Sequence, residues 1–513
     1  MEVLAVSGVC IVIATAGFST GVRKLLVTFL STLLNHYYHW KYPIRDVSRE
    51  KKIPSLPYTW PNGTGDTAKF INGPRNSRIW RQKYGDIYRL WAGSTPEIVV
   101  SDPIHLKEIF SDSDRHSKAE NNDSGYLMSQ ILGKCIGLLS PPEWKAARTK
   151  LEYPFTHRAI ESSAPMMLKV TKQYFDEFFR AETFQEVHLD PMKDLEFYPF
   201  LITATLIYGE LDASQTQNLK EIMPLRIELF TYVFKGGLSR FAISKYLPTR
   251  FNHLLREFQT KWKEFNRQVY LDKTSKMLDV PIVSFWNLMV AGGILEEQLL
   301  QTLDEALFAN LDVTSSVVAW NLVFLAAYPA VQARLHEEIG NATADGPDVL
   351  RSYIKNDKTY LAACIKETAR HRPILSFSIP QAPPTDRIVG DWLLPKNTMV
   401  IVDTFAVNMR REFWGKDAHD YRPSRFQEVN EASNRYQLWR YGLGPRQCMG
   451  KYLADFMLRA LLCHLVGRIS LENAEPGGDL NELLNDDMKM WVRTPQTKLR
   501  CKLRNCSSVP VSG

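Results

Sequence analysis

The sequence predicts a mainly helical α+β fold with small β-sheets, in one large domain behind an N-terminal transmembrane helix. Apolar residues recur at helical spacing over most of residues 141–340. Short β-like runs bounded by Gly and Pro flank that region, without the regular alternation of strands and helices that marks a parallel sheet. An uncharged apolar run near the start is long enough to cross a bilayer.

The composition fits a protein with a large buried core and no nucleic-acid partner. Of the 513 residues, 45% are apolar and 11% aromatic, and the formal net charge is +7. The basic residues are dispersed, whereas nucleic-acid binding usually needs a concentrated basic stripe. A mild basic excess suits an anionic membrane surface, an acidic protein partner or a merely solvated surface. The seven scattered cysteines form no CxxC pair, which argues against a disulfide scaffold or zinc site and favours a reducing compartment.

The first 61 residues divide into an anchor and a linker. Residues 3–22 carry no charge, and their length of about 20 residues matches the hydrocarbon core of a bilayer. Arg23 and Lys24 follow, which predicts that this end lies in the cytosol. We therefore assign residues 1–24 to a single-pass membrane anchor, 25–61 to a second apolar run and a proline-rich linker, and 62–513 to the globular domain. A cleaved signal peptide is the alternative, but the start of the chain provides no basic residue for one.

Within the globular domain, local patterns predict individual elements. Residues 86–90 and 97–100 predict a β-hairpin. The longest helical pattern, at residues 295–328, predicts one helix of about 50 Å at about 1.5 Å per residue. Further predictions are a helix at 361–371, β-hairpin structure at 387–402 around Gly390, and a last helix from about 450 to 467.

One cysteine follows a glycine-rich turn at residues 441–450, Tyr-Gly-Leu-Gly-Pro-Arg-Gln-Cys-Met-Gly. This pattern predicts a tight loop that opens onto a helix. Backbone N–H groups at the start of a helix hydrogen-bond a thiolate and lower its pKa. A thiolate ligand on heme iron favours O–O cleavage. For Cys10, Cys364 and Cys463, by contrast, the preferred interpretation is a buried structural cysteine.

This run resembles the heme-binding signature of the cytochrome P450 family, aromatic-x-x-Gly-x-Arg-x-Cys-x-Gly, with Tyr441 in place of the more usual phenylalanine. The resemblance implies that heme b (iron protoporphyrin IX) is the cofactor and that Cys448 is the axial ligand of its iron. It also implies that Arg446, Gly444 and Gly450, together with Tyr441, contribute to cofactor binding.

A Glu-x-x-Arg pair precedes the cysteine loop. Glu367 and Arg370 are three residues apart, so they share one face of the predicted helix and are able to form an ion pair. Arg425, in a Pro-Ser-Arg-Phe run, provides a second guanidinium for the same carboxylate. By resemblance to the family, these three residues form a structural triad that fixes the polypeptide on the heme side.

A Trp-x-x-x-Arg pair lies earlier in the chain. Trp144 and Arg148 are four residues apart on a predicted helix and therefore lie on one face. They resemble the clamp that holds the heme propionates in the family, and Arg446 would be its second cation. Without the other motifs, surface packing would explain the same spacing.

Residues 309–314, Ala-Asn-Leu-Asp-Val-Thr, lie inside the longest predicted helix and resemble the oxygen-activation segment of the family. Asn310 replaces the usual glycine, and Val313 replaces the threonine that normally follows the acid. Thr314 comes one residue late, a rotation of about 100° around the helix, and takes that place only if the helix is bulged. We hypothesise that Asp312, with help from Asn310 or Thr314, relays protons during oxygen activation. The alternative is that Asp312 pairs with a distant Arg or Lys.

The substrate contacts are less specific. By resemblance, residues 112–132 and 374–380 border the substrate side of the heme. Ser376, Phe377, Ser378 and Trp491 are candidate contacts. Ordinary core packing explains each of them equally well, so no individual residue is assigned.

The resemblance implies a monooxygenase that uses O₂ to oxidise a C–H bond of a small organic substrate. The segment Asn-Leu-Asp-Val-Thr is similar to that of fungal members of secondary-metabolite biosynthesis, especially those acting on peptide-derived compounds. No Gly-rich nucleotide motif follows a strand, so electrons are expected from a separate NADPH-cytochrome P450 reductase, docked near Cys448, Lys145 and Lys451. The anchor predicts an endoplasmic reticulum membrane protein whose heme-thiolate catalytic domain, residues 62–513, lies in the cytosol.

Three alternatives remain open. The replacement at Val313 is compatible with an enzyme of the same family that couples, closes rings or desaturates without inserting oxygen. Outside enzymes, a heme-binding sensor or carrier needs the cysteine loop but neither the triad nor an acid on the long helix. A membrane receptor with an incidental cysteine predicts a colourless protein.

Overall fold

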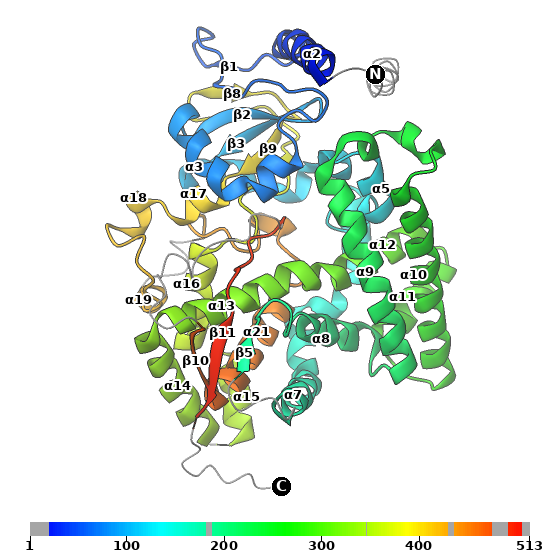
Figure 1. Ribbon diagram of the computed structural model, residues 1–513, viewed down its shortest axis with the longest axis vertical. Coiled ribbons are helices and arrows are strands. Elements are labelled where there is room, and N and C mark those ends of the chain that lie inside the picture. The colour runs from blue at the N-terminus through cyan, green and yellow to red at the C-terminus, as the bar shows by residue number, and fades with distance from the viewer. Residues whose placement is uncertain (1–19, 181–186, 345, 429–434, 475–490, 505–513) are drawn as a thin grey trace.

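The computed structural model describes residues 20–180, 187–344, 346–428, 435–474 and 491–504 (Figure 1). Most of the predicted anchor therefore lies outside the described residues. Helix α2 (Thr20–Lys41) runs across the predicted boundary at residue 24 into the second apolar run. In the described part of the chain, one helical stretch, Glu296–Ala327, is long and apolar enough to cross a membrane. Because 78% of its most apolar window is buried inside the protein, it is better explained as a core helix.

The largest sheet among the described residues has five strands in the order β2-β3-β9-β6-β4. Its strands are β2 (Ile87–Ala92), β3 (Thr95–Val100), β4 (Ser117–Lys118), β6 (Gln381–Ala382) and β9 (Met399–Val402). The hairpin of β2 and β3 confirms the sequence prediction, with Gly93 in its turn at φ +57°. This sheet lies at the same end of the molecule as α2 (Figure 1).

Two smaller sheets have three strands each in the described residues. One contains β1 (Arg45–Asp46), β8 (Trp392–Leu394) and β7 (Arg387–Val389), and the other β10 (Ile469–Asn473), β11 (Leu499–Leu503) and β5 (Val187–Leu189). The predicted hairpin at Gly390 is present, but it ends at Leu394. Strand β9, which the sequence placed with it, pairs in parallel with β3 instead. That pairing is a long-range contact, which a local pattern does not encode.

Helices make up most of the remaining body. The α-helices besides α2 are α3 (Gly73–Tyr84), α4 (Pro103–Phe110), α5 (Tyr126–Leu132), α6 (Glu143–Leu151), α7 (His157–Arg180), α8 (Phe197–Tyr208), α9 (Ala213–Lys235), α10 (Arg250–Ser275), α11 (Pro281–Val290), α12 (Glu296–Ala309), α13 (Ser315–Ala327), α14 (Pro329–Ala344), α15 (Pro347–Lys355), α16 (Tyr360–His371), α17 (Thr404–Asn408), α18 (Arg411–Trp414), α19 (Arg425–Glu428) and α21 (Lys451–Arg468). Short 3-10 or π segments are η1 (Thr67–Ile71), η2 (Ser113–Arg115), η3 (Glu120–Asp123), η4 (Tyr153–Phe155), η5 (Gly237–Arg240), η6 (Ala242–Tyr246), η7 (Asn310–Thr314) and η8 (Gly444–Arg446). The helices predicted at 361–371 and 450–467 are confirmed as α16 and α21.

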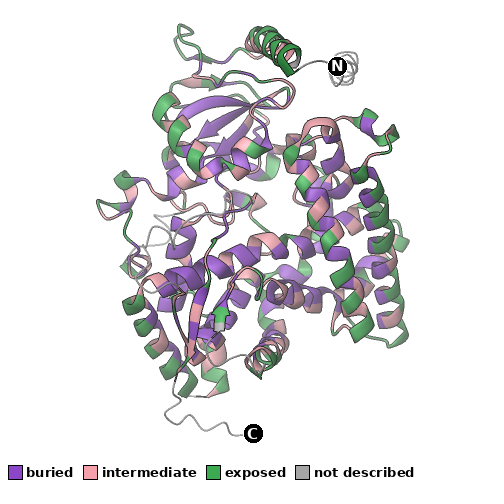
Figure 2. Ribbon diagram, in the orientation of Figure 1, coloured by how far each residue is buried: buried purple, intermediate pink, exposed green. Residues whose placement is uncertain are grey.

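The long predicted helix is not one regular helix. α12 and α13 are joined by η7, a π-helical segment. Together they cross the middle of the body (Figure 1), and α13 is buried along nearly its whole length (Figure 2). Helix α13 contacts α14, α16 and β10, which explains why its sequence is apolar on every face.

Candidate active site

The cysteine loop is closed by its own backbone. The N–H of Cys448 donates a hydrogen bond of 2.8 Å to the carbonyl oxygen of Tyr441. Gly444 has φ +69°, and a Cβ atom there would collide with Oγ of Ser113 and lie 2.5 Å from the carbonyl oxygen of Phe110. Only glycine therefore fits this position. The loop delivers Cys448 to the start of α21, as the sequence predicts.

The environment of the Cys448 thiol acts on its pKa in both directions. Burial by the surrounding protein atoms has the largest effect and raises the pKa overall, although the side chain is accessible, and the charge of Glu305 acts in the same direction. The backbone N–H of Gly450 and the charges of Arg148 and Lys451 lower it. A hydrogen bond and nearby cations stabilise a thiolate, which is the form that binds metals.

The contacts of Tyr441 explain why this chain has tyrosine where the family usually has phenylalanine. Its hydroxyl group donates a hydrogen bond of 2.8 Å to Oδ1 of Asp455 on α21. Arg440 forms an ion pair with the same carboxylate oxygen. A phenylalanine could not make this bond, so tyrosine fastens the start of the loop to the helix that follows it. The sequence alone gave no reason to single out Asp455.

Trp144, Arg148 and Arg446 come together, as predicted. The guanidinium carbon of Arg446 lies 4.6 Å from the ring centroid of Trp144, within the range of a cation–π interaction. Nη1 of Arg446 donates a hydrogen bond of 2.8 Å to the carbonyl oxygen of His116. Nη1 of Arg148 donates 3.2 Å to the carbonyl oxygen of Gln447, which adjoins Cys448. Helix α6 is thereby attached to the cysteine loop.

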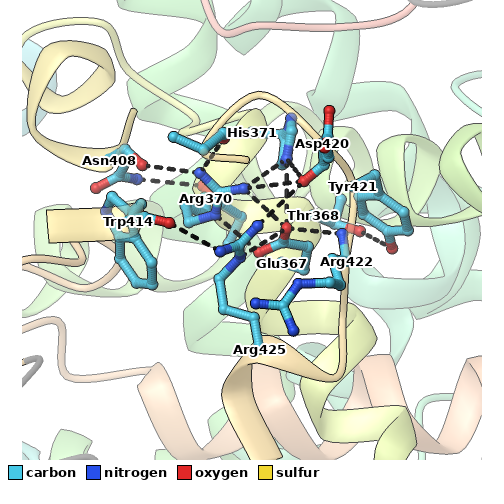
Figure 3. A network of polar contacts seen from close by, with 12 residues as sticks. Glu367, Thr368, Arg370, His371, Asn408, Trp414, Asp420, Tyr421, Arg422 and Arg425 are labelled. Carbon is cyan, nitrogen blue, oxygen red and sulfur yellow. Dashed lines mark hydrogen bonds and ion pairs between the residues drawn. The ribbon is translucent and has the colours of Figure 1, made fainter. Parts of the chain in front are cut away.

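The predicted triad is assembled and buried (Figure 3). Arg370 donates from Nε and Nη2 to the two carboxylate oxygens of Glu367, both at 2.8 Å. Nε of Arg425 lies 3.4 Å from Oε1 of Glu367. Burial raises the pKa of Glu367, but its bonds to Arg370 and His371 outweigh burial and lower the pKa to about 2.

The triad is linked to the cysteine loop through the backbone. Nη1 of Arg370 donates to the carbonyl oxygens of Ala418, at 2.7 Å, and of Asn408, at 3.2 Å. The side chain of Asn408 in turn bonds both backbone groups of Trp439 (Figure 3 shows Asn408 beside Arg370). Trp439 lies two residues before Tyr441, so the triad sets the position at which the loop begins.

The bulge that the sequence required is present in η7. Oγ1 of Thr314 donates a hydrogen bond of 2.8 Å to Oδ1 of Asn310. Nδ2 of Asn310 donates one of 2.7 Å to the carbonyl oxygen of Ala306. Both side chains are buried. Asn310 and Thr314 are therefore brought together. The side-chain amide of Asn310 also gives the carbonyl oxygen of Ala306 a hydrogen-bond donor at the start of the irregular turn.

One face of the bulged helix is accessible. Ala309 is exposed although its neighbours in sequence are buried, and Glu305, Ala306, Asp312 and Val313 are partly exposed. We call these five residues the accessible face; their spacing of three or four residues is that of one side of a helix. Asp312 and Val313 lie on it, whereas the buried Thr314 does not replace Val313 there.

Asp312 is bonded by an aromatic side chain. Nε1 of Trp491 donates 2.9 Å to Oδ2 of Asp312. Burial raises the pKa of Asp312, while this hydrogen bond and the charge of Arg226 lower it. Arg226 does not bond Asp312, because its Nε donates to both oxygens of Asp304, at 2.7 and 2.9 Å. Among the described residues, the partner of Asp312 is thus a tryptophan and not the Arg or Lys of the alternative hypothesis.

Residues 70–499 match the family model described as Cytochrome P450. The chain belongs to the cytochrome P450 family. Similar proteins include the cytochrome P450 monooxygenase aclC of Aspergillus oryzae, which is 42% identical over 91% of this chain and 95% of that protein. The cytochrome P450 monooxygenase asaD of Aspergillus flavus is 41% identical over 98% of this chain and 96% of that protein. The cytochrome P450 monooxygenase gliC of Aspergillus fumigatus is 38% identical over 93% of this chain and 94% of that protein. The predicted likeness to fungal members is confirmed.

The P450 chain is accordingly an oxygen-incorporating oxidoreductase. The family binds heme iron and uses an organic substrate, O₂ and a redox partner. When bound, heme supplies the activation of O₂ that no amino-acid side chain performs. The residues fit such a group, because an accessible thiol lies beside Arg148 and Arg446, and heme propionates are anions.

Lys118 is a third cation that the sequence analysis missed. Burial and the neighbouring charge of Arg446 lower the pKa of Lys118 to about 7. Both effects disfavour the charged form of the lysine, and a bound anionic group would favour it again. No local pattern marks Lys118, because its segment meets Arg446 through a long-range contact, the hydrogen bond from Arg446 to the carbonyl oxygen of His116.

Glu305 is a second residue that the P450 resemblance did not indicate. It lies on the accessible face of the long helix, and its Oε2 accepts a hydrogen bond of 3.1 Å from the N–H of Gly137. A Cβ atom at residue 137 would collide with this carboxylate. Burial raises the pKa of Glu305, while Gly137 and Cys135 lower it.

Two of the sequence candidates at 376–378, Phe377 and Ser378, make structural contacts, whereas Oγ of the buried Ser376 has no hydrogen-bond partner among the described residues. Phe377 is fully buried, and its ring centroid lies 5.6 Å from that of Trp80. Oγ of Ser378 accepts 2.9 Å from the N–H of Val402 in β9. These contacts attach the segment to α3 and to β9. Of the sequence candidates, Trp491 is the one that contacts the accessible face.

Proposed function

We propose that this protein is a membrane-anchored heme b monooxygenase that oxidises a C–H bond of a small organic, secondary-metabolite substrate. The supporting observation is the accessible Cys448 thiol at the start of α21, in a loop where Arg148 bonds the adjoining Gln447 and Arg446 lies over the ring of Trp144. Cys448 would ligate the iron, and the cations, with Lys118, would hold the propionates. Tyr441, Gly444 and Gly450 shape the loop.

Asp312 takes the role of proton donor on the substrate side. It lies on the accessible face of the long helix, and burial raises its pKa, so it is able to take up and release a proton more readily than an exposed carboxylate at neutral pH. Asn310 and Thr314 support this role by stabilising the bulge that directs Asp312. The triad of Glu367, Arg370 and Arg425 contributes structure.

The absorption spectrum of the reduced, carbon-monoxide-bound protein tests the ligand and the cofactor together. The wild type is expected to show the red shift of thiolate ligation, and Cys448→Ala to lose it. Cys463→Ala is the matched control, because Cys463 is buried in the same helix α21. A wild-type protein without this red shift, or a Cys448→Ala protein that keeps it, contradicts the proposal.

Asp312→Asn tests proton delivery. The carboxamide keeps the shape of the side chain but does not exchange a proton, so product formation is expected to fall by about 100-fold or more. The carbon-monoxide spectrum should stay unchanged. Turnover at the wild-type rate would remove Asp312 from the mechanism.

The electron donor is proposed to be a separate NADPH-cytochrome P450 reductase. Lys451 lies beside the cysteine loop, where its Nζ donates 3.0 Å to Oε1 of Gln447, and Lys145 is exposed on α6. This basic surface suits an acidic docking partner. Turnover of the purified protein with NADPH and no reductase would exclude this partner.

Membrane attachment is proposed for residues 1–24, with the domain 62–513 in the cytosol at the endoplasmic reticulum. Support comes from α2, where Leu25, Phe29 and Leu33 are 72%, 64% and 56% exposed. Such a row of exposed apolar residues is unusual on a soluble surface. Deletion of residues 1–24 should move the protein from the membrane pellet toward the supernatant, and full membrane retention would place the anchor elsewhere.

A second candidate reaction is coupling, ring closure or desaturation without oxygen insertion. It is favoured by one observation: Val313, which carries no exchangeable proton, lies on the accessible face where the family usually has threonine. Turnover under labelled dioxygen separates the two reactions. Label in the product supports hydroxylation, and unlabelled product supports the second candidate.

A further inference from the structure

We infer that Trp491 is a positioning residue for Asp312: its indole N–H holds one carboxylate oxygen, so that the other is directed along the accessible face of the long helix. This inference rests on the proposed function of Asp312 as a proton donor. Trp491 and Asp312 are far apart in the sequence, and the contact joins the C-terminal segment to η7.

The carboxylate of Asp312 accepts one hydrogen bond among the described residues. Nε1 of Trp491 lies 2.9 Å from Oδ2, and in the part of the chain that the structure describes no other donor bonds this carboxylate. Arg226 is occupied by Asp304. Without Trp491, this carboxylate would have no hydrogen-bond donor to fix its direction, and only the charge of Arg226 would offset its burial.

Trp491 is itself held on two sides. Its ring stacks on Phe234 of α9, with centroids 5.0 Å apart and planes at 16°, and its centroid lies 5.9 Å from that of Phe230. The chain direction is fixed two residues later, where the carbonyl oxygen of Arg493 accepts 2.7 Å from Nε1 of Trp320 on α13. The N–H direction is therefore set before any substrate binds.

The chemistry of indole suits this task. The indole Nε1–H is a donor only, so it bonds a carboxylate but does not accept its proton. It is also uncharged. An Arg or Lys in the same place would stabilise the ionised carboxylate more strongly through a charge-assisted bond and would make proton uptake harder. A neutral donor positions Asp312 and leaves it able to exchange a proton.

The test compares Trp491→Phe with a matched control, Trp262→Phe. The Nε1 of Trp262, on α10, also donates 2.9 Å to α12, but to the backbone carbonyl oxygen of Leu300. Trp491→Phe is expected to lower product formation about tenfold, with the O₂ that no longer oxidises substrate reduced to hydrogen peroxide by electrons from the redox partner. Because its bond lowers the pKa of Asp312, its removal should also shift the pH profile to higher pH. Trp262→Phe should change neither.

If Trp491 acts by positioning Asp312, the loss of product in Trp491→Phe must depend on the Asp312 carboxylate. Two measurements test this dependence. In an Asp312→Asn background, Trp491→Phe should cause no further loss of product. In the holoenzyme labelled with 5-fluorotryptophan, the ¹⁹F resonance that disappears in Trp491→Phe should titrate with pH, and Asp312→Asn should abolish that titration. This second readout does not depend on turnover.

The outcomes separate the two levels of argument. Loss in Asp312→Asn together with wild-type product formation and pH profile in Trp491→Phe overturns this inference and leaves the proposed function intact. An equal loss from Trp491→Phe in both backgrounds also overturns it, because Trp491 would then act through packing. Wild-type turnover in Asp312→Asn overturns the proton-donor role itself, and the inference with it.

Discussion

The hydroxyl group of Thr314 donates a hydrogen bond of 2.8 Å to Oδ1 of Asn310, four residues earlier on the same helix. Asn310 passes the interaction on by donating from Nδ2 to the carbonyl oxygen of Ala306. Asn310, which replaces the usual glycine, and Thr314, the threonine displaced by one residue, are therefore coupled. Their bond stabilises the π-helical turn and leaves Val313 on the accessible face.

Thr314→Val is expected to destabilise the bulge. It leaves Oδ1 of the buried Asn310 without a donor, at a cost of about 1 to 3 kcal/mol in the free energy of unfolding, measured by urea denaturation. Thr203→Val in α8 is the control, because its hydroxyl bonds the Pro199 carbonyl oxygen, which keeps its helical N–H partner. If both variants lose the same stability, the Asn310–Thr314 bond has no special role.

Glu367→Gln is expected to prevent normal assembly of the heme side. Arg370 and Arg425 would keep their buried charges without a carboxylate, which costs about 3 to 5 kcal/mol. The melting temperature and the heme content per chain should both fall. Glu228→Gln, which breaks the exposed pair with Arg250, should leave both unchanged. A Glu367→Gln protein with full heme content would contradict the structural role of the triad.

The pKa of Glu367 also predicts a pH dependence. Because the folded-state pKa is lowered from 4.5 to about 2, the ion pairs contribute stability above pH 4.5, and this contribution is lost as the pH falls through about 2. Unfolding of the wild type should therefore become easier in this acid range. Glu367→Gln should lose less stability than the wild type over the same range, and a parallel loss in both proteins would argue against the shift.

Lys118→Met is expected to weaken retention of the heme. It removes one of the cations near Arg446, and the lost charge-assisted bond should speed heme transfer to apomyoglobin by about ten- to hundredfold. Lys134→Met, at an exposed position of the loop that follows α5, should have no effect. Equal transfer rates for Lys118→Met and the wild type would remove Lys118 from the cofactor site.

A buried carboxylate cluster far from the long helix predicts a pH dependence of the opposite sign. Lys69 pairs with Glu97 at 3.1 Å and Asp66 at 3.5 Å, and Nη2 of Arg240 bonds the backbone of Asp123. Burial and the nearby Glu97 raise the pKa of Asp123 from 3.8 to about 8. A raised carboxyl pKa contributes stability below the ordinary value that is lost as the pH rises toward about 8.

Asp123→Asn should therefore lose less stability than the wild type between about pH 4 and about pH 8, measured by urea denaturation. Asp279→Asn, at an exposed position, should follow the wild type. Identical pH profiles for Asp123→Asn and the wild type would show that Asp123 ionises normally in the folded protein.

Several parts of this protein follow from spacing along the chain. Glu367 and Arg370 pair because residues three apart share a helix face. The cysteine loop follows from glycines, of which Gly444 has a conformation and a contact that only glycine tolerates. The spacing of the signature then places Tyr441 and Cys448 at either end of one backbone hydrogen bond.

Which distant residues meet these motifs depends on long-range packing. Trp491 reaches Asp312, Lys118 reaches Arg446, and β9 leaves its expected hairpin for β3. The sequence predicts that Thr314 takes the place of the usual threonine only in a bulged helix. The bulge is present, but packing buries Thr314 against Asn310. The physical reason is that such contacts join segments far apart in the chain, and the energy that selects them comes from the packed whole rather than from any local pattern.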